Sequence, residues 1–384
     1  MKIPFWVIAD LVTQTASPGG FQVSLEDIVP GAGTLVSGPL SRYSSDGTPF
    51  EKGDVLFGKL RPYLAKFWLA DREGVAGGDI HVYRPRKGVD PRYLAYIVGS
   101  RDFIRYAVAA SKGVKMPRVE WMNLRQYGVN RYDERTQRGI ADYLDRETGE
   151  IDAMLAKLNS LSEALAERKV LVIQNLTQRS DSGVRWTAVP TAHLFSSIGS
   201  GTTPKGVHYY AESGSGIPWV TTSELRESVI VETTQDVTEE AVGALSALRV
   251  HPRGSVVIAM YGATIGRLAM LGVDAAMNQA CCAFSSPRNV DSRFFYYALW
   301  GQREELILEA NGGGQPNISQ GFLRRWRVPC PPLVEQRRIA DRLDEVTGRI
   351  DAMLATIDEL KALLIERRSA LITDVVTGRK KVPA

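Results

Sequence analysis

The stretch GEIDAMLAKL at residues 149–158 recurs almost unchanged as GRIDAMLATI at residues 348–357. The likeness extends over residues 136–169 and 335–368, so two similar segments lie 199 positions apart in a chain of 384 residues. In both segments apolar residues recur at alternating steps of three and four, a spacing that predicts the seam of a coiled coil. The predicted seam residues are Ile151, Met154, Leu158, Leu161 and Leu165, and again Ile350, Met353, Ile357, Leu360 and Leu364.

Weaker similarity joins the segments that precede the two helices, so the repeat covers a whole domain. GDVLFGKLRPYLAK at residues 53–66 resembles GSVVIAMYGATIGR at residues 254–267. Short runs of Val, Ile and aromatic residues broken by Gly, Pro and Asp fill both domains, which favours mixed sheets with a few helices. The predicted fold class is α+β, with two mixed α/β domains that alternate with two long helices. The predicted bounds are 1–133 and 180–332 for the domains, 134–179 and 333–378 for the helices, and 379–384 for a basic tail.

Chain connectivity decides how the two helices pair. Each predicted helix has about 40 residues and therefore a length of roughly 60 Å, at about 1.5 Å per residue. Parallel pairing would force the second domain to span that length between its two ends, whereas antiparallel pairing brings those ends together. We therefore expect an antiparallel coiled coil and an internal pseudo-twofold repeat.

Two related but non-identical domains at a fixed separation suit a target with two different half-sites. Duplex DNA is such a target, because its grooves recur about every 34–36 Å along the axis. The net charge of +4 and the isoelectric point of about 8.8 are too close to neutral to show by themselves whether DNA is the target. A structural dumbbell that brings two protein partners together without reading DNA is the alternative.

The composition excludes several classes of protein. With 44% hydrophobic residues, 23% charged residues and no apolar run of the roughly 18–20 residues that cross a bilayer, the chain is typical of a soluble protein. Its N-terminal segment lacks a signal-peptide pattern, so a cytoplasmic location is expected. Cys281, Cys282 and Cys330 form neither a CxxC pair nor a disulfide framework, and the four histidines lack metal-ligand spacing. No metal is expected.

The nearest signal for catalysis is GDVLFGKL at residues 53–60, which mimics a phosphate-binding P-loop. Leu60 stands where Ser or Thr must bind magnesium, and the apolar interior of the motif is typical of a buried strand. The sequence contains no Asn/Asp-Pro-Pro-aromatic motif of an adenine methyltransferase and no glycine-rich fingerprint for a methyl donor. We therefore expect no catalysis by this chain. An enzyme, such as a nuclease or a self-contained methyltransferase, is the less favoured alternative.

Taken in order, these segments resemble a known family. The repeat with its LVEQRRIADRLDEVTGRIDAML pattern, SGTTPKGVHYY followed by GIPWVTTSEL, YGATIGR, and GGGQPNIS are similar to the specificity (S) subunit of type I restriction-modification systems. The resemblance covers nearly the whole chain, although the first domain has GKLRPYLAK in place of GATIGR.

This resemblance implies a function and a set of partners. It implies two target-recognition domains that each bind one half of an asymmetric bipartite DNA site, with the helix pair setting the spacer. It also implies two adenine methyltransferase (M) subunits and restriction or motor (R) subunits as partners. S-adenosylmethionine, ATP and Mg²⁺ would belong to those partners, and this chain would hold no cofactor.

Candidate DNA contacts in the second domain lie in three segments. SGTTPKGVHYY supplies hydroxyl, cationic and aromatic groups for phosphates or base edges, YGATIGR is a glycine-permitted turn, and GGGQPNIS offers amides suited to adenine. The candidates are Thr202, Thr203, Lys205, Tyr209, Tyr261, Thr264, Arg267, Gln315 and Asn317. A solvated loop or an ordinary hairpin turn also explains these segments.

Candidate contacts in the first domain lie in two basic segments, a strand with its following turn and a loop around Gly113. Neutralisation of DNA phosphates is the functional interpretation, and a merely solvated cationic face is the alternative. The candidates are Lys59, Arg61, Tyr63 and Lys66 in the first segment, and Lys112, Lys115 and Arg118 in the second.

Overall fold

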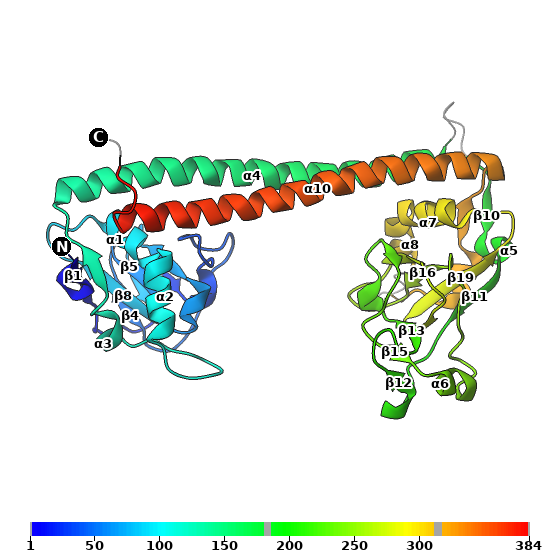
Figure 1. Ribbon diagram of the computed structural model, residues 1–384, viewed down its shortest axis with the longest axis horizontal. Helices are drawn as coiled ribbons and strands as arrows, with labels where there is room; N and C mark the ends of the chain where they lie inside the picture. The colour runs from blue at the N-terminus through cyan, green and yellow to red at the C-terminus, as the bar shows by residue number, and fades with distance from the viewer. Residues whose placement is uncertain (1, 180–185, 311–316, 383–384) are drawn as a thin grey trace. The chain divides into compact units, whose positions relative to one another are not determined.

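The computed structural model of the protein describes residues 2–179, 186–310 and 317–382 (Figure 1). The chain divides into two compact units, Met1–Asn159 with Ile357–Ala384 (unit 1) and Ser160–Thr356 (unit 2). Both divisions fall inside long helices, α4 (Glu134–Gln178) and α10 (Leu333–Val376). Each unit therefore contains one mixed α/β domain and a stretch of both helices. The mixed α/β content predicted from the sequence is confirmed.

Unit 1 is built around two small sheets. An antiparallel sheet has the strand order β2-β8-β5-β6, and a second sheet has the order β3-β7-β4, in which β3 is parallel to β7. β1 pairs with β9. The strands are β1 (Lys2–Pro4), β2 (Ala9–Leu11), β3 (Gln22–Val23), β4 (Thr48–Phe50), β5 (Val55–Gly58), β6 (Phe67–Leu69), β7 (Gly74–Ala76), β8 (Ile80–Pro85) and β9 (Gly128–Asn130), and the helices are α1 (Pro91–Val98), α2 (Arg101–Ala109) and α3 (Trp121–Leu124).

Unit 2 has a larger central sheet, of order β11-β19-β16-β17-β14, and a second sheet of order β12-β15-β13-β18. β10 pairs with β20. The strands are β10 (Ala188–Pro190), β11 (Phe195–Ser200), β12 (Tyr210–Ala211), β13 (Ile217–Val220), β14 (Val229–Ile230), β15 (Asp236–Val237), β16 (Val256–Ala259), β17 (Leu268–Leu271), β18 (Ala276–Met277), β19 (Cys281–Pro287) and β20 (Arg327–Pro329). The helices are α5 (Thr191–Leu194), α6 (Glu239–Ala244), α7 (Ser292–Gly301), α8 (Arg303–Ala310) and α9 (Gln320–Arg325).

The central sheets of the two units repeat one another. The orders β2-β8-β5-β6 and β11-β19-β16-β17 agree strand for strand, and each ends in an antiparallel hairpin. Every residue of β5 and of β16 is buried; β5 consists of three apolar residues and a glycine, and β16 of apolar residues alone. The weak likeness between residues 53–66 and 254–267 therefore reflects a shared hairpin. In unit 1 the apolar strand of this hairpin, β5, forms the interior of the P-loop-like motif at residues 53–60.

In unit 1 the long helices share the core of the domain. Residues of both helices join the buried cluster that holds α1 and the central sheet, namely Ile140, Leu144, Ile372, Val375 and Val376. Lys380, just after α10, lies with its Nζ 5.5 Å from the ring centre of Tyr143, and Arg368 Nε donates to Asp152 Oδ1 at 2.9 Å. Position along α10 thus falls as position along α4 rises, so the helices of unit 1 are antiparallel.

The same relation holds in unit 2. Lys169 Nζ of α4 donates to Asp351 Oδ1 of α10 at 2.7 Å. Further along α4, Ile173 lies in one buried cluster with Ile339 and Leu343, which precede Asp351 on α10. The helix stretches of unit 2 are therefore also antiparallel.

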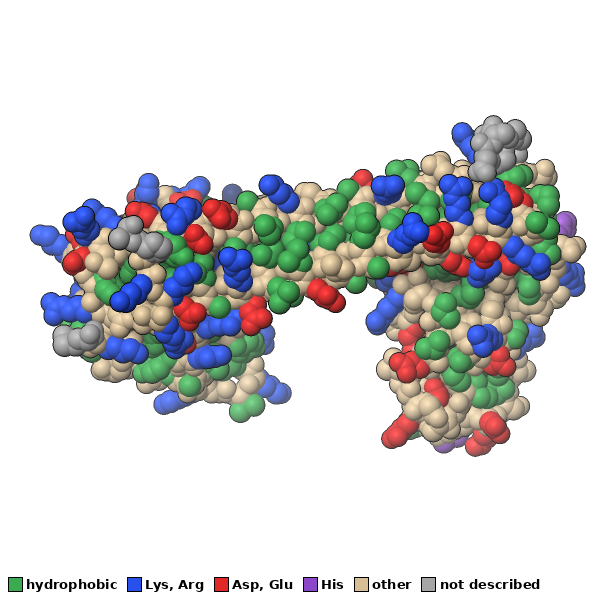
Figure 2. Space-filling model, turned by 45° about the horizontal axis from the view of Figure 1, so that its top comes forward, with side chains coloured by type: hydrophobic (Ala, Val, Ile, Leu, Met, Phe, Trp, Pro, Cys, Tyr) green, Lys and Arg blue, Asp and Glu red, His purple; other side chains and the backbone are tan. Residues whose placement is uncertain are grey.

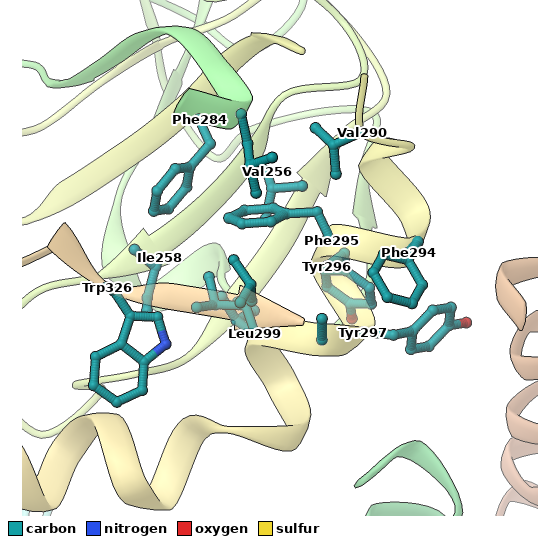
Figure 3. Close-up of a cluster of buried hydrophobic side chains, with 14 of the residues drawn as sticks. Val256, Ile258, Phe284, Val290, Phe294, Phe295, Tyr296, Tyr297, Leu299 and Trp326 are labelled. Atoms are coloured by element: carbon teal, nitrogen blue, oxygen red, sulfur yellow. The ribbon is translucent and has the colours of Figure 1, made fainter. Parts of the chain in front are cut away.

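Phe295 lies at the centre of the core of unit 2, where its ring points toward Phe284 and Val256 (Figure 3). The side chain is fully buried, with ring centroids 4.5 Å from Phe195 and 4.8 Å from Phe284. Phe295→Ala should lower the free energy of unfolding of unit 2 by about 3–5 kcal/mol, because it removes buried apolar surface and leaves a cavity. Denaturant unfolding followed by tryptophan fluorescence measures this loss.

The matched control for this prediction is Leu308→Ala on α8. Leu308 is 71% exposed, so its truncation should change the free energy of unfolding by no more than about 0.5 kcal/mol. Equal effects of the two substitutions would contradict the central place of Phe295 in the core.

Candidate nucleic-acid interface

Two of the predicted DNA-contacting segments of unit 2 meet at one edge of its central sheet. Tyr261, two residues after β16, pairs with Asn317 in an antiparallel bridge. Met260 N donates to Ala280 O at 2.8 Å, and Ile318 N donates to Met260 O at 2.8 Å. Tyr261 and Asn317 are both exposed. The YGATIGR turn and the end of the GGGQPNIS segment therefore present a phenol and an amide side by side.

The SGTTPKGVHYY loop reaches the same edge through Thr203. The Thr203 hydroxyl donates to Gln279 Oε1 at 2.5 Å, and the carbonyl of Thr202 accepts an indole N–H at 3.3 Å. Lys205 is exposed and Tyr209 is half-buried. The contact of Thr203 with Gln279 adds a hydroxyl and an amide to the phenol and amide already at the edge, a mixture that suits both phosphates and base edges.

Arg267, in contrast to these exposed candidates, binds a carboxylate of its own unit. Its Nη2 donates to Glu227 Oε2 at 2.7 Å, and Arg303 Nη1 donates to the same carboxylate at 3.2 Å. The hydrogen bond with Glu227 raises the pKa of Arg267 above its usual value. Thr264 is half-buried, and its carbonyl accepts the backbone N–H of Arg267 at 3.0 Å, which closes the turn. Gln315 lies outside the described residues.

Unit 1 has the same backbone framework at the equivalent edge. Lys59 N donates to Asp79 O at 2.9 Å, and Val119 N donates to Lys59 O at 3.0 Å. Leu60 pairs with Arg118 in an antiparallel bridge. Each of these contacts has its counterpart in the edge of unit 2, although the side chains differ. The two basic segments predicted from the sequence are thus brought together.

Two of the basic candidates in unit 1 bind groups of their own domain. Lys66 Nζ donates to Leu25 O at 2.7 Å, and Arg118 Nη2 donates to Asp79 Oδ1 at 2.6 Å. The ammonium group of Lys66 thus binds the start of the segment that joins β3 to β4. The guanidinium of Arg118 has a carboxylate partner, so it offers DNA less positive charge than an unpaired arginine would.

The other candidates of unit 1 are more accessible. Arg61 is exposed and adopts a left-handed backbone with a φ of 50°, directly before the turn Pro62–Leu64 that leaves Tyr63 54% exposed. Lys112 and Lys115 are exposed in their loop, while Lys59 is half-buried. The edge of unit 1 therefore presents cationic groups and a phenol, whereas the edge of unit 2 presents amides, a hydroxyl and a phenol.

Sequence reasoning missed three exposed side chains at these edges. Val114 is fully exposed and Met116 is 55% exposed within the basic loop of unit 1, and Gln279 is exposed in unit 2. The available signal for Gln279 was the polar pair Asn-Gln inside the apolar run AAMNQACCAF. Apolar side chains exposed on a basic loop suit partial insertion into a groove.

Every second position of the predicted seam is buried more deeply than its neighbours. Ile151, Ile350, Ile357 and Leu364 are buried, Leu158 and Leu165 are half-buried, and Met154, Leu161, Met353 and Leu360 are 40–50% exposed. Apolar side chains accordingly reach the surface of both long helices (Figure 2). Exposed apolar surface of this kind is typical of a protein-binding site.

The groups that sequence analysis considered for metal or redox chemistry are buried or scattered. Cys281 and Cys282 lie on β19, and burial raises the pKa of both thiols to about 12, so they stay protonated. Within residues 2–179, 186–310 and 317–382, no group of three or more His, Cys, Asp or Glu side chains is arranged to hold a metal ion. In the same ranges, none of the helices has the length and apolar character needed to cross a membrane.

Comparisons with known proteins bear on this geometry. A family model described as the type I restriction modification DNA specificity domain matches residues 185–362. The EcoR124I/EcoR124II specificity subunit of a type I restriction enzyme from Escherichia coli is 26% identical over 171 residues. That alignment covers 42% of this chain and 42% of the relative, so this chain spans less than half the length of the curated relative that it matches.

Two solved structures share the fold over almost the whole chain. A chain from work on complex assembly and conformational transition of the type I R-M system aligns with a TM-score of 0.73 and 18% identity, covering 99% of this chain and 98% of that one. The HsdS subunit from Thermoanaerobacter tengcongensis aligns with a TM-score of 0.56 and 18% identity, covering 99% and 97%. Residues 185–362 therefore match the model of the type I restriction modification DNA specificity domain, and the resemblance of the chain to type I specificity subunits is confirmed.

Proposed function

We propose that this chain is the non-catalytic DNA-recognition subunit of a type I restriction-modification complex. Each domain binds one half of an asymmetric bipartite DNA site. The observation that carries the proposal is the pair of equivalent edges, built on one backbone framework with different side chains. Lys59 and Arg118 occupy the edge of unit 1, whereas Tyr261 and Asn317 occupy that of unit 2. Two such edges read two different half-sites.

The long helices have two roles in this proposal. As an antiparallel coiled coil with a pseudo-twofold axis, they set the spacer between the half-sites. Their exposed apolar positions, with the half-buried Leu155 and Leu354 at matched places, offer surfaces to two adenine methyltransferase (M) subunits. Restriction (R) subunits join the same complex. S-adenosylmethionine, ATP and Mg²⁺ belong to those partners, which act on DNA in the cytoplasm.

Methylation-sensitive sequencing of a host genome, with this gene present and deleted, tests the proposal. We expect one bipartite sequence with a fixed gap to be methylated only when the gene is present. The assembled complex should also bind a duplex with that sequence roughly 10³-fold or more tightly than random duplex. Equal binding to all duplexes, or no DNA footprint at all, would instead favour a scaffold that joins two protein partners.

The salt dependence of DNA binding should show whether the basic loop of unit 1 neutralises DNA phosphates. Replacing Lys112 and Lys115 together by Ala should reduce the slope of log affinity against log salt by about 0.9 for each phosphate that the loop no longer neutralises. Both half-sites should keep their sequences, because phosphate contacts carry no base information. Fluorescence anisotropy across a salt series measures the slope. Lys157→Ala on α4 is the control, and an equal effect there would contradict a phosphate-binding loop.

A further inference from the structure

A hydrogen-bonded network joins the domain of unit 1 to the long helix α4. Asp145 on α4 accepts Arg92 Nη1 at 2.6 Å and the Tyr96 hydroxyl at 2.6 Å, and both donors lie on α1. The same tyrosine oxygen lies 3.3 Å from Thr148 Oγ1. Burial raises the pKa of Tyr96 above its usual value, so the hydroxyl keeps its proton and remains a donor. One carboxylate thus receives two donors from one helix of the domain.

The same network occurs in unit 2 with the same residue types. Asp344 on α10 accepts Arg293 Nη1 at 2.6 Å and the Tyr297 hydroxyl at 2.7 Å, and both donors lie on α7. The hydroxyl of Tyr297 lies 3.2 Å from Thr347 Oγ1, and burial raises the pKa of this tyrosine as well. We call each Arg-Tyr-Asp-Thr set a clamp.

A buried glutamine repeats beside each clamp. Gln137 Oε1 on α4 accepts the backbone N–H of Asp90 at 3.1 Å, and Gln336 Oε1 on α10 accepts that of Asp291 at 2.8 Å. Each glutamine also donates through Nε2 to a carbonyl just before its own helix, at 2.9 Å and 2.8 Å respectively. Asp90 and Asp291 cap α1 and α7, so the first turn of each of these helices is also fixed to a long helix.

The two clamps consist of the same residue types, whereas the two sheet edges that carry the candidate DNA contacts (the reading edges) have different side chains. An edge differs because its half-site differs, but the angle at which a domain sits on its helix must be set in both units. Apolar packing between domain and helix is non-directional and tolerates small rotations, whereas two short hydrogen bonds to one carboxylate define a direction. Asp145 and Asp344 are each 43% exposed, and ion pairs so exposed contribute little to stability. Their repetition is therefore explained better by geometry than by stability.

We propose that Tyr96 and Asp145 in unit 1, and Tyr297 and Asp344 in unit 2, are positioning residues that fix the angle of each domain on its helix. Through that angle they restrict the spacer that the complex accepts. This inference rests on the proposed function, because it assumes two half-sites read at a set distance. No clamp residue lies at a reading edge, so the clamps act on spacing and leave the identity of the bases unchanged.

The test uses the chain assembled with its methyltransferase subunits and a panel of duplexes. Each duplex carries the two half-sites found by methylation sequencing, with spacers from two base pairs shorter to two longer than the natural one. Tyr297→Phe and Asp344→Asn should each lower the preference for the natural spacer over its nearest neighbours by roughly tenfold, the effect of about one lost hydrogen bond to a charged group. Tyr96→Phe should do the same from unit 1.

Glu345→Gln on α10 is the matched control, because Glu345 bonds Arg349 on its own helix and leaves the clamp intact. The control should retain the natural spacer preference. Unchanged spacer preference in Tyr297→Phe and Asp344→Asn, with or without a lower melting temperature, would overturn the inference. If Asp344→Asn fails to assemble, Tyr297→Phe decides, since it removes a single oxygen. If neither Asp344→Asn nor Tyr297→Phe assembles, the clamp has only a structural role, and the inference is overturned as well.

The test separates this inference from the proposed function. A wild-type complex that prefers no duplex of the panel, and methylates no bipartite sequence, would refute the proposed function itself. A wild-type complex with one preferred spacer, combined with variants that keep the same preference, would refute only the positioning role.

Discussion

When residues 180–332 are exchanged for the equivalent domain of a relative with another target, the assembled complex should methylate sites in which one half is new and the other half is unchanged. The reading edge and most of the core of unit 2 are formed by residues within 180–332, such as Phe284 and Phe295. Each mismatched base pair costs about 1–3 kcal/mol, so a chimaera facing the original site should lose roughly 10³-fold or more in affinity across a half-site.

Exchange of residues 1–133 is the reciprocal experiment, and it should change only the other half of the site. Methylation sequencing of both chimaeras gives both half-sites directly. A chimaera that folds, retains methylation and changes both halves, or neither, would contradict one half-site per domain. In the chimaera of residues 180–332, Gln336 should be kept, because its side-chain oxygen accepts the backbone N–H of residue 291 and so joins the exchanged domain to α10.

A longer coiled coil should lengthen the spacer. Duplicating residues 152–158 in α4 and residues 351–357 in α10 adds one heptad to each helix, which continues the seam and adds about 10.5 Å at 1.5 Å per residue. Since ten base pairs occupy about 34 Å, the preferred spacer should grow by about three base pairs, while both half-sites keep their sequences. Methylation by the assembled complex of duplexes with graded spacers measures the shift.

Duplication in only one helix is the control for this experiment. It puts the two seams out of step by a heptad and should lower the stability of the complex without giving a longer, well-defined spacer. Retained methylation at the natural spacer after duplication in both helices would rule out the helices as the element that sets the distance.

The long helices and the repeat could be predicted because their signals are local. A helix repeats every 3.6 residues, so the steps from Ile151 to Leu165 reveal it within one segment. The shared hairpin was visible for the same reason, as an apolar run between glycines. Seam exposure at Met154 and Met353 was not predicted, because it depends on how deeply two particular helices pack together.

The side-chain partners of the candidate site residues also could not be predicted from the sequence. Arg267 is paired with Glu227, which is 40 positions away and has a left-handed backbone with a φ of 52°. No pattern along the chain reveals such a partner. The clamps did leave a trace, since DPRYLAY and DSRFFYY share Asp-x-Arg-x-x-x-Tyr, but the meaning of this spacing appears only when α1 and α7 are placed against the long helices.

The chain order of the two units has a consequence for biosynthesis. Unit 2 is continuous, whereas unit 1 combines residues 1–159 with residues 357–384. Ile372, Val375 and Val376 belong to the buried core of unit 1, so this core stays incomplete on the ribosome until residues 372–376 have been translated. Unit 2 can thus fold first although its domain is made second, and a nonsense codon near position 357 would leave the first domain without its apolar cover.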